Sequence, residues 1–147
     1  MKITICGSIA FIDEMAEAKR RLEKMGHEVQ MPPTEMVDGA GTIIPAKEYY
    51  KFRKTTTRTD GWIWDRKEEA MRNHFNKVMW SDAILVLNHD KSNISGYIGA
   101  NTLLEMGLVF HHGKGIYLFG PIPELAYKEE ILGMKPMVID ADFSRIV

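Results

Sequence analysis

One carboxylate, Glu105, is a candidate for chemistry because it lies in an otherwise apolar segment behind a glycine-containing loop. The segment 96–114 reads GYIGANTLLEMGLVFHHGK, and the residues around Glu105 are mostly leucine, methionine and valine. A loop of this kind exposes backbone N–H groups at a helix start, where anions bind well. The alternative is an ordinary solvated stripe, because Asn101, Glu105 and His112 share one side of the predicted helix 100–112.

Other polar residues give less specific signals. His74 falls at the edge of the inward face of a predicted helix over 65–80, where a hydrogen-bonded core histidine is commoner than a catalyst. One cysteine and scattered histidines do not make the convergent ligand set of a zinc site. Loops that contain Ser8, Asn93 and Ser95 can offer hydroxyl and N–H groups to a phosphate, but the GxxxxGK[ST] and GxGxxG fingerprints are absent.

Length and composition favour one globular domain over residues 1–147, with an insert around 34–65. The chain has 147 residues, of which 45% are hydrophobic, and a net charge of −1. A net charge this close to zero does not indicate binding to duplex nucleic acid, which usually requires a clearly basic face. The single cysteine, Cys6, lies in an apolar run and indicates a reducing compartment. No apolar stretch is long enough for a membrane span and the first residues read as a strand, so we expect a cytoplasmic protein.

The elements that must position these residues follow an alternating strand and helix pattern. The short β-branched run 2–6 precedes Gly7 and Ser8, and a helical pattern then runs from Asp13 to Gly26. Further strands are predicted at 27–31, 83–87, 115–119 and 136–139, and further helices at 65–80, 100–112 and 124–132. Right-handed crossovers then give a flavodoxin/Rossmann-like α/β fold, with a five-stranded parallel sheet in three α/β/α layers. In such folds ligands bind at the carboxyl edge of the sheet.

The region 34–65 allows two interpretations. A helix within 44–58 carries Tyr49 and Tyr50 among several basic residues, and Trp62 and Trp64 follow. One interpretation is a basic and aromatic flap over a site for a flat, anionic ligand, with these aromatics stacked on it. The other is a peripheral helix packed on the sheet or on a partner subunit. We favour the second, because long excursions are more often structural than lid-like.

Three motifs, taken in order, resemble the nucleoside 2-deoxyribosyltransferase superfamily, which includes the 2′-deoxynucleoside 5′-monophosphate N-glycosidases. They are ICGSI at 5–9, SDAILVLN at 81–88, and LEMG at 104–107 followed by HHGKGIYLF. Each motif is short, so the specificity lies in their order and spacing. The order matches over most of the chain, and the region 34–65 has no counterpart.

The resemblance implies a function and a set of site residues. Glu105 becomes the nucleophile that attacks the anomeric carbon of a deoxyribosyl group and forms a glycosyl-enzyme intermediate, with backbone N–H groups at the helix start keeping it ionised. His74 or a nearby aspartate, Asp82 or Asp90, orients it or handles the proton of the leaving base. Two loops hold the ligand, and the candidate substrate-binding residues are Gly7, Ser8, Ile9, Asn88, Asp90, Ser95, Gly96, Gly99, Asn101 and Thr102. The resemblance implies no metal or cofactor, a small nucleoside or nucleotide as ligand, and a homodimer or larger assembly whose partner residues close the site.

The sequence also departs from the family pattern. His74 stands where an aspartate is usual, no acidic residue directly precedes the nucleophile, and Ala10 replaces an arginine found in the monophosphate branch. Two alternatives therefore stay open. One is a non-catalytic nucleotide-binding or sensing module of the same fold, and the other is a ribonucleotide hydrolase, whose usual PGGxGTxxE signature is missing here.

Overall fold

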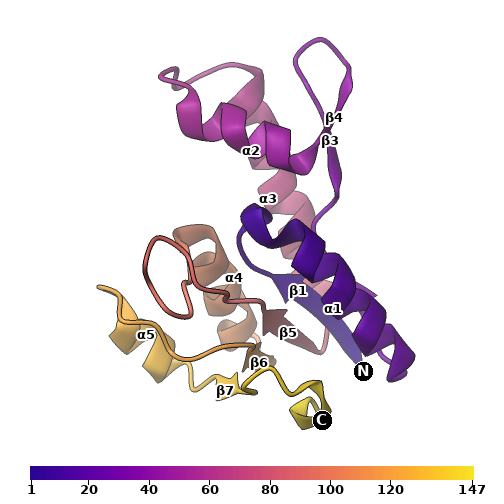
Figure 1. Cartoon of the computed structure of the whole chain (residues 1–147), viewed down its shortest axis with the longest axis vertical. Coiled ribbons are helices and arrows are strands. Elements are labelled where there is room, and N and C mark those ends of the chain that lie inside the picture. The colour runs from indigo at the N-terminus through magenta and orange to yellow at the C-terminus, as the bar shows by residue number, and fades with distance from the viewer.

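A five-stranded, wholly parallel sheet forms the centre of the computed structural model, which describes residues 1–147 (Figure 1). The order across the sheet is β2-β1-β5-β6-β7. The strands are β1 (Lys2–Cys6), β2 (Glu28–Gln30), β5 (Ala83–Val86), β6 (Gly115–Leu118) and β7 (Met137–Val138). The predicted sheet is confirmed, and four of its strands are shorter than the apolar patterns indicated.

Helices cover both faces of the sheet, which gives the predicted three layers. The covering helices are α1 (Ile12–Lys24), α3 (Trp62–Trp80), α4 (Ala100–His111) and α5 (Lys128–Gly133), whereas α2 (Ala46–Thr55) lies outside the layers. Short 3-10 helices form at Ile9–Phe11 and Phe143–Arg145. Strand alternation divides the core, because Ile3 and Ile5 pack with α1 whereas Cys6 packs with α3 and α4. None of the helices has the length and apolar character needed to cross a membrane.

The point where the chain reverses its winding direction lies at β1. This strand pairs with β2 on one side and with β5 on the other, and Cys6 lies opposite Val86. The carboxyl ends of β1 and β5 therefore meet, and the loops that follow them leave from the same edge. This arrangement is the topological switch point at which open α/β sheets bind ligands.

Asn88 ties together the loops at this edge. Its Nδ2 donates to the carbonyls of Gly96 (3.2 Å) and Pro121 (2.9 Å), and its Oδ1 accepts from the N–H of Gly120 (2.7 Å). A β-carbon at Gly96, where φ is +68°, would lie 2.2 Å from the Pro121 oxygen. The prediction that Asn88 and Gly96 bind substrate is therefore corrected, because both are engaged in holding the loop.

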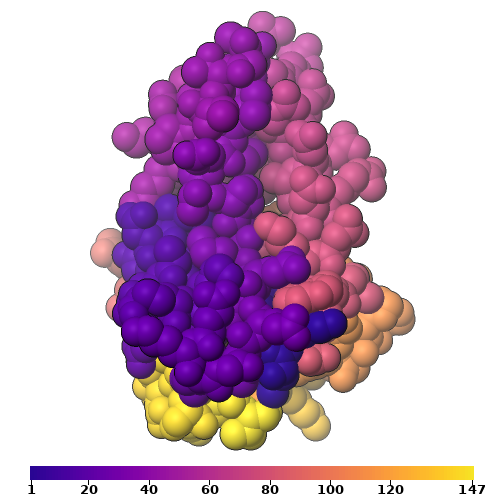
Figure 2. Space-filling model, turned by 90° about the vertical axis from the view of Figure 1, so that its right-hand side faces the viewer, coloured from indigo at the N-terminus to yellow at the C-terminus, as the bar shows by residue number.

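The region 34–65 rises above the sheet as an antiparallel hairpin followed by α2 (Figure 1). Figure 2 shows residues of this region, in purple and magenta, at the top of the molecule. The hairpin strands, β3 (Glu35–Val37) and β4 (Ile43–Pro45), were not predicted from the sequence. Asp38 closes their turn by accepting from the N–H groups of Ala40 and Thr42. Because β4 extends to Pro45, α2 begins at Ala46, within the 44–58 range predicted for this helix.

Candidate active site

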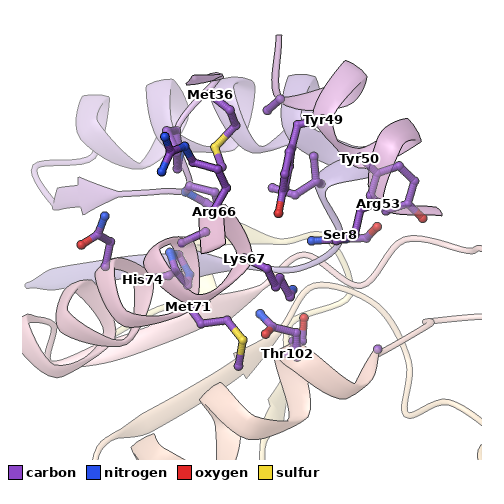
Figure 3. Close-up of a pocket in the computed structure, with 18 of the residues that line it drawn as sticks. Ser8, Met36, Tyr49, Tyr50, Arg53, Arg66, Lys67, Met71, His74 and Thr102 are labelled. Atoms are coloured by element: carbon purple, nitrogen blue, oxygen red, sulfur yellow. The ribbon is translucent and has the colours of Figure 1, made fainter. Parts of the chain in front are cut away.

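A cavity of about 1140 Å³ opens where the carboxyl edge of the sheet faces the hairpin and α2 (Figure 3). Its walls come from the loop after β1, the hairpin, α2, α3, the loop before α4 and the start of α4. Small-molecule sites in proteins usually measure about 300–1,000 Å³. The cavity is therefore large enough for a nucleotide-sized ligand.

Glu105 lies in the wall of this cavity and is only 2% exposed. Asn101, one turn earlier on α4, donates from Nδ2 to Glu105 Oε1 at 2.9 Å. His74, which α3 contributes, places Nε2 3.9 Å from the same oxygen. The hydrogen bond from Asn101 thus holds the carboxyl group in place.

Burial dominates the electrostatics of Glu105. The loss of water raises the pKa of its carboxyl group from 4.5 to about 7, against the opposing effects of Cys6 and of the positive charge on Lys67. Glu105 is the sixth residue of α4, beyond the free N–H groups of the first turn. Glu105 therefore lies beyond the N–H groups that were expected to keep it ionised, and burial shifts its carboxyl group toward the protonated form.

His74 and Cys6 surround Glu105 with neutral groups. Burial, together with the nearby charge of Lys77, lowers the pKa of His74 to about 4. His74 is therefore neutral near pH 7, and its approach to Glu105 is not an ion pair. Cys6 Sγ lies 3.5 Å from His74 Nε2, and burial raises the pKa of this thiol well above its usual range.

The structure brings together most of the residues predicted to form the site. The cavity is lined by Gly7, Ser8, Ile9, His74, Gly99, Asn101, Thr102 and Glu105. Figure 3 shows Ser8 close to Arg53, and Lys67 between His74 and Thr102. Residues 7–9, after β1, and residues 99–102, at the start of α4, thus face one cavity.

Asp82, Asp90 and Ser95 lie elsewhere. Asp82 precedes β5, at the edge opposite the cavity, and its Oδ2 accepts from the N–H of Lys2 at 2.8 Å. Asp90 Oδ1 accepts from the N–H of Gly96 at 3.0 Å, and Ser95 is exposed on the outer loop. None of the three lines the cavity, so their predicted catalytic or binding roles are corrected.

The cavity carries an excess of positive charge, which only the less favoured interpretation of the region 34–65, a basic flap over an anionic ligand, had indicated. The lining contains six basic residues, Arg53, Lys54, Arg66, Lys67, Lys77 and Lys91, against three acidic ones, Glu35, Glu69 and Glu105. Lys67 shares one face of α3 with Met71 and His74, four and seven positions along, and this helical spacing was a signal that could have revealed it. Burial lowers the pKa of Lys67 to about 8.

Lys91 joins three separate parts of the cavity wall. Its Nζ donates to Ser8 Oγ at 2.9 Å and to the Tyr50 hydroxyl at 2.8 Å, and it lies over the rings of Tyr50 and Tyr97. Ser8 and Lys91 are 83 positions apart, so no local pattern could have paired them. The Lys91 ammonium group is thus held by the hydroxyl groups of Ser8 and Tyr50, next to the loop after β1.

Both interpretations of the 34–65 region apply in part. Tyr49 is 3% exposed and donates to the carbonyl of Ile63, and Trp62 packs against Tyr49 and Phe52 outside the cavity. These contacts are structural. Tyr49 nevertheless lines the cavity from α2 beside Tyr50 and Arg53, as a flap over an anionic ligand would.

The raised pKa of Glu105 gives a testable dependence of stability on pH. The folded state holds this proton up to about pH 7 whereas the unfolded chain loses it near 4.5, so raising the pH through this window lowers the free energy of unfolding. Glu105→Gln removes the effect. Its stability relative to the wild type should rise by about 2–3 kcal/mol between pH 5 and pH 8, as measured by urea unfolding. Glu68→Gln, at an exposed site, is the control, and a difference that does not change with pH would contradict the assignment.

Comparison with solved structures identifies the architecture. The structure resembles a 2-deoxyribosyltransferase from the psychrotolerant bacterium Bacillus psychrosaccharolyticus, with a TM-score of 0.51 and 18% sequence identity. The match covers 85% of this chain and 76% of that one. No protein-family model and no curated protein sequence matches the chain. The protein therefore has the fold of a 2-deoxyribosyltransferase, as the order of motifs in its sequence indicated.

Proposed function

We propose that the protein breaks the N-glycosidic bond of a nucleoside or nucleoside 5′-monophosphate, with Glu105 as the nucleophile. The observation that carries this proposal is the buried Glu105 carboxyl group, held by Asn101 in the wall of a nucleotide-sized cavity at the switch point of the sheet. The likeness in fold to a 2-deoxyribosyltransferase and the ordered sequence motifs support the same chemistry.

The reaction requires Glu105 to be ionised. One carboxylate oxygen bonds to the anomeric carbon, the C–N bond to the base breaks, and the bonding electron pair leaves with the base. Water or a second base then attacks the same carbon and releases the carboxylate. A pKa of about 7 leaves enough ionised Glu105 at neutral pH, and the sparse solvation of that anion makes it a reactive nucleophile.

The departing base must receive a proton, and Lys67 is the group best suited to supply it. Lys67 lines the cavity on α3, close enough to Glu105 for their charges to interact, and its pKa of about 8 keeps it protonated but acidic near neutral pH. His74, whose pKa is about 4, is neutral near pH 7, so it is a weaker candidate for this proton transfer. This assignment replaces the aspartates expected from the sequence.

The basic end of the cavity favours a phosphorylated substrate. Lys91 is held by Ser8 and Tyr50, and Arg53 and Lys54 extend the positive surface along α2. A phosphate group accepts hydrogen bonds from such ammonium and hydroxyl groups. Within the proposed function, a nucleoside 5′-monophosphate with its phosphate at Lys91 therefore fits better than a free nucleoside.

The proposed function is tested by release of free base. Incubation with a panel of deoxynucleosides, their 5′-monophosphates and ribonucleotides should release base from at least one member, detected by chromatography. The rate should rise as the pH increases through about 7, because Glu105 must lose its proton. Glu105→Gln should lower the rate by at least about 1000-fold, whereas the exposed control Glu68→Gln should not. Unchanged release from Glu105→Gln excludes this nucleophile, and tight binding without release from any member would favour a non-catalytic binding module.

The phosphate preference is tested separately with Lys91→Met. Loss of a charged hydrogen-bond donor costs about 1.5–3 kcal/mol, so kcat/KM for the 5′-monophosphate should fall about 10–100-fold. The unphosphorylated nucleoside should lose much less. Lys51→Met, which alters an exposed lysine of α2 outside the cavity, is the matched control. An equal loss for both substrates would show that Lys91 supports the loop and not the phosphate.

A further inference from the structure

We propose that Cys6, His74 and Glu105 form a binding site for a thiophilic divalent cation such as Zn²⁺, and that this ion blocks the nucleophile. The three side chains come from the end of β1, from α3 and from α4, and all three are buried. Their potential ligand atoms, Sγ, a ring nitrogen and a carboxylate oxygen, all lie within 4.8 Å of one another. Binding itself does not depend on the proposed function, whereas the blocking effect rests on it.

The separations of the three ligand atoms suit a tetrahedral ion. Zinc bonds of about 2.3 Å to sulfur and about 2.0–2.1 Å to nitrogen place those two atoms about 3.6 Å apart, and Cys6 Sγ lies 3.5 Å from His74 Nε2. The corresponding nitrogen–oxygen separation is about 3.4 Å, and Nε2 lies 3.9 Å from Glu105 Oε1. A shift of about half an ångström therefore brings the nitrogen–oxygen pair to its tetrahedral separation, and Cys6 Sγ and the Glu105 oxygen lie within 4.8 Å of each other.

The protein's own contacts engage the proposed ligand atoms only weakly. At 3.9 Å, His74 Nε2 and Glu105 Oε1 are too far apart for a hydrogen bond, and the contact of Nε2 with the Cys6 thiol is a weak one. Buried polar atoms are normally paired, so a cation bound by Nε2 and Oε1 would engage atoms that lack a strong bond to each other.

The charge balance and access also favour an ion here. A thiolate and a carboxylate neutralise a dication completely, and imidazole is a third preferred ligand. His74 and Glu105 line the cavity, which provides a path for entry and leaves the fourth coordination position for water. Lys67 is the one opposing charge described near Glu105. Removing that charge should therefore strengthen binding.

Linear zinc motifs could not reveal this set of ligands. Cys6 and His74 are 68 positions apart, and Glu105 lies on a third element. Such motifs detect ligands that share a turn or a hairpin, whereas these ligands converge only because β1, α3 and α4 meet at the switch point. The expectation of no metal site rested on the single cysteine, on the scattered histidines and on the family resemblance.

Cobalt spectroscopy tests the proposal directly, because Cys6 is the only cysteine in the chain. The tag-free, chelator-treated protein is titrated with Co²⁺, and a thiolate-to-cobalt charge-transfer band in the near ultraviolet should grow to one ion per chain. Zn²⁺ should displace the cobalt and abolish the band. Cys6→Ser should remove the band and weaken Zn²⁺ binding at least about 100-fold, and Lys67→Met should tighten it several-fold.

Controls separate this site from other metal ligands and from activity. Glu105→Gln should keep the band but weaken cobalt binding, which provides a second variant if Cys6→Ser does not fold. A His111→Asn, His112→Asn double variant, which removes an exposed histidine pair, should bind as the wild type does. Absence of the band in folded wild-type protein, or Zn²⁺ binding unaffected by Cys6→Ser, would overturn the proposal. A band in a protein that releases no base would support the site and count against the enzymatic function alone.

Discussion

The desolvated carboxyl group of Glu105 is the constraint on which the rest of the site depends. A buried carboxylate with a single short hydrogen bond is costly to ionise, and this cost appears as a pKa raised to about 7. Near neutral pH the folded protein gives up part of its stability to keep the group in this state. Groups that are costly to hold in a fold are often functional, because the same lack of solvation makes an anion reactive.

The fold explains why this carboxyl group meets the others around it. The chain winds in opposite directions on the two sides of β1, and this opens a crevice at the carboxyl edge of the sheet. The helices α3 and α4 lie side by side next to this crevice. Side chains alternate between the two faces of β1, so Cys6 points toward these helices. The helical repeat of α3 and of α4 brings Lys67, His74 and Glu105 to the wall of the cavity. The hairpin and α2 then add aromatic and basic side chains from above (Figure 3).

The sequence was sufficient for features encoded by local periodicity. The alternating pattern predicted the sheet, and the apolar neighbours of Glu105 indicated the burial that this side chain has in the fold. Asp82 was assigned wrongly even though the sequence held the means to exclude it, because a residue before a parallel strand lies at the edge away from the site.

Contacts between residues far apart in the sequence could not be predicted from local patterns. Lys91 meets Ser8 across 83 positions, and the role of Asn88 depends on carbonyls brought in from two other loops. A net charge of −1 likewise concealed a cavity in which basic residues outnumber acidic ones by six to three. Composition averages over the whole surface, whereas a ligand responds to the charges that face it.

The most direct test of the central claim is to find the covalent intermediate on Glu105. The protein is mixed with a deoxynucleoside 5′-monophosphate that it turns over, quenched in acid, and examined by intact and peptide mass spectrometry. The account predicts one added deoxyribosyl phosphate group per chain, located on the peptide that contains Glu105. Turnover with the group attached to a different residue, or with no attachment under conditions that trap the intermediate, would contradict it.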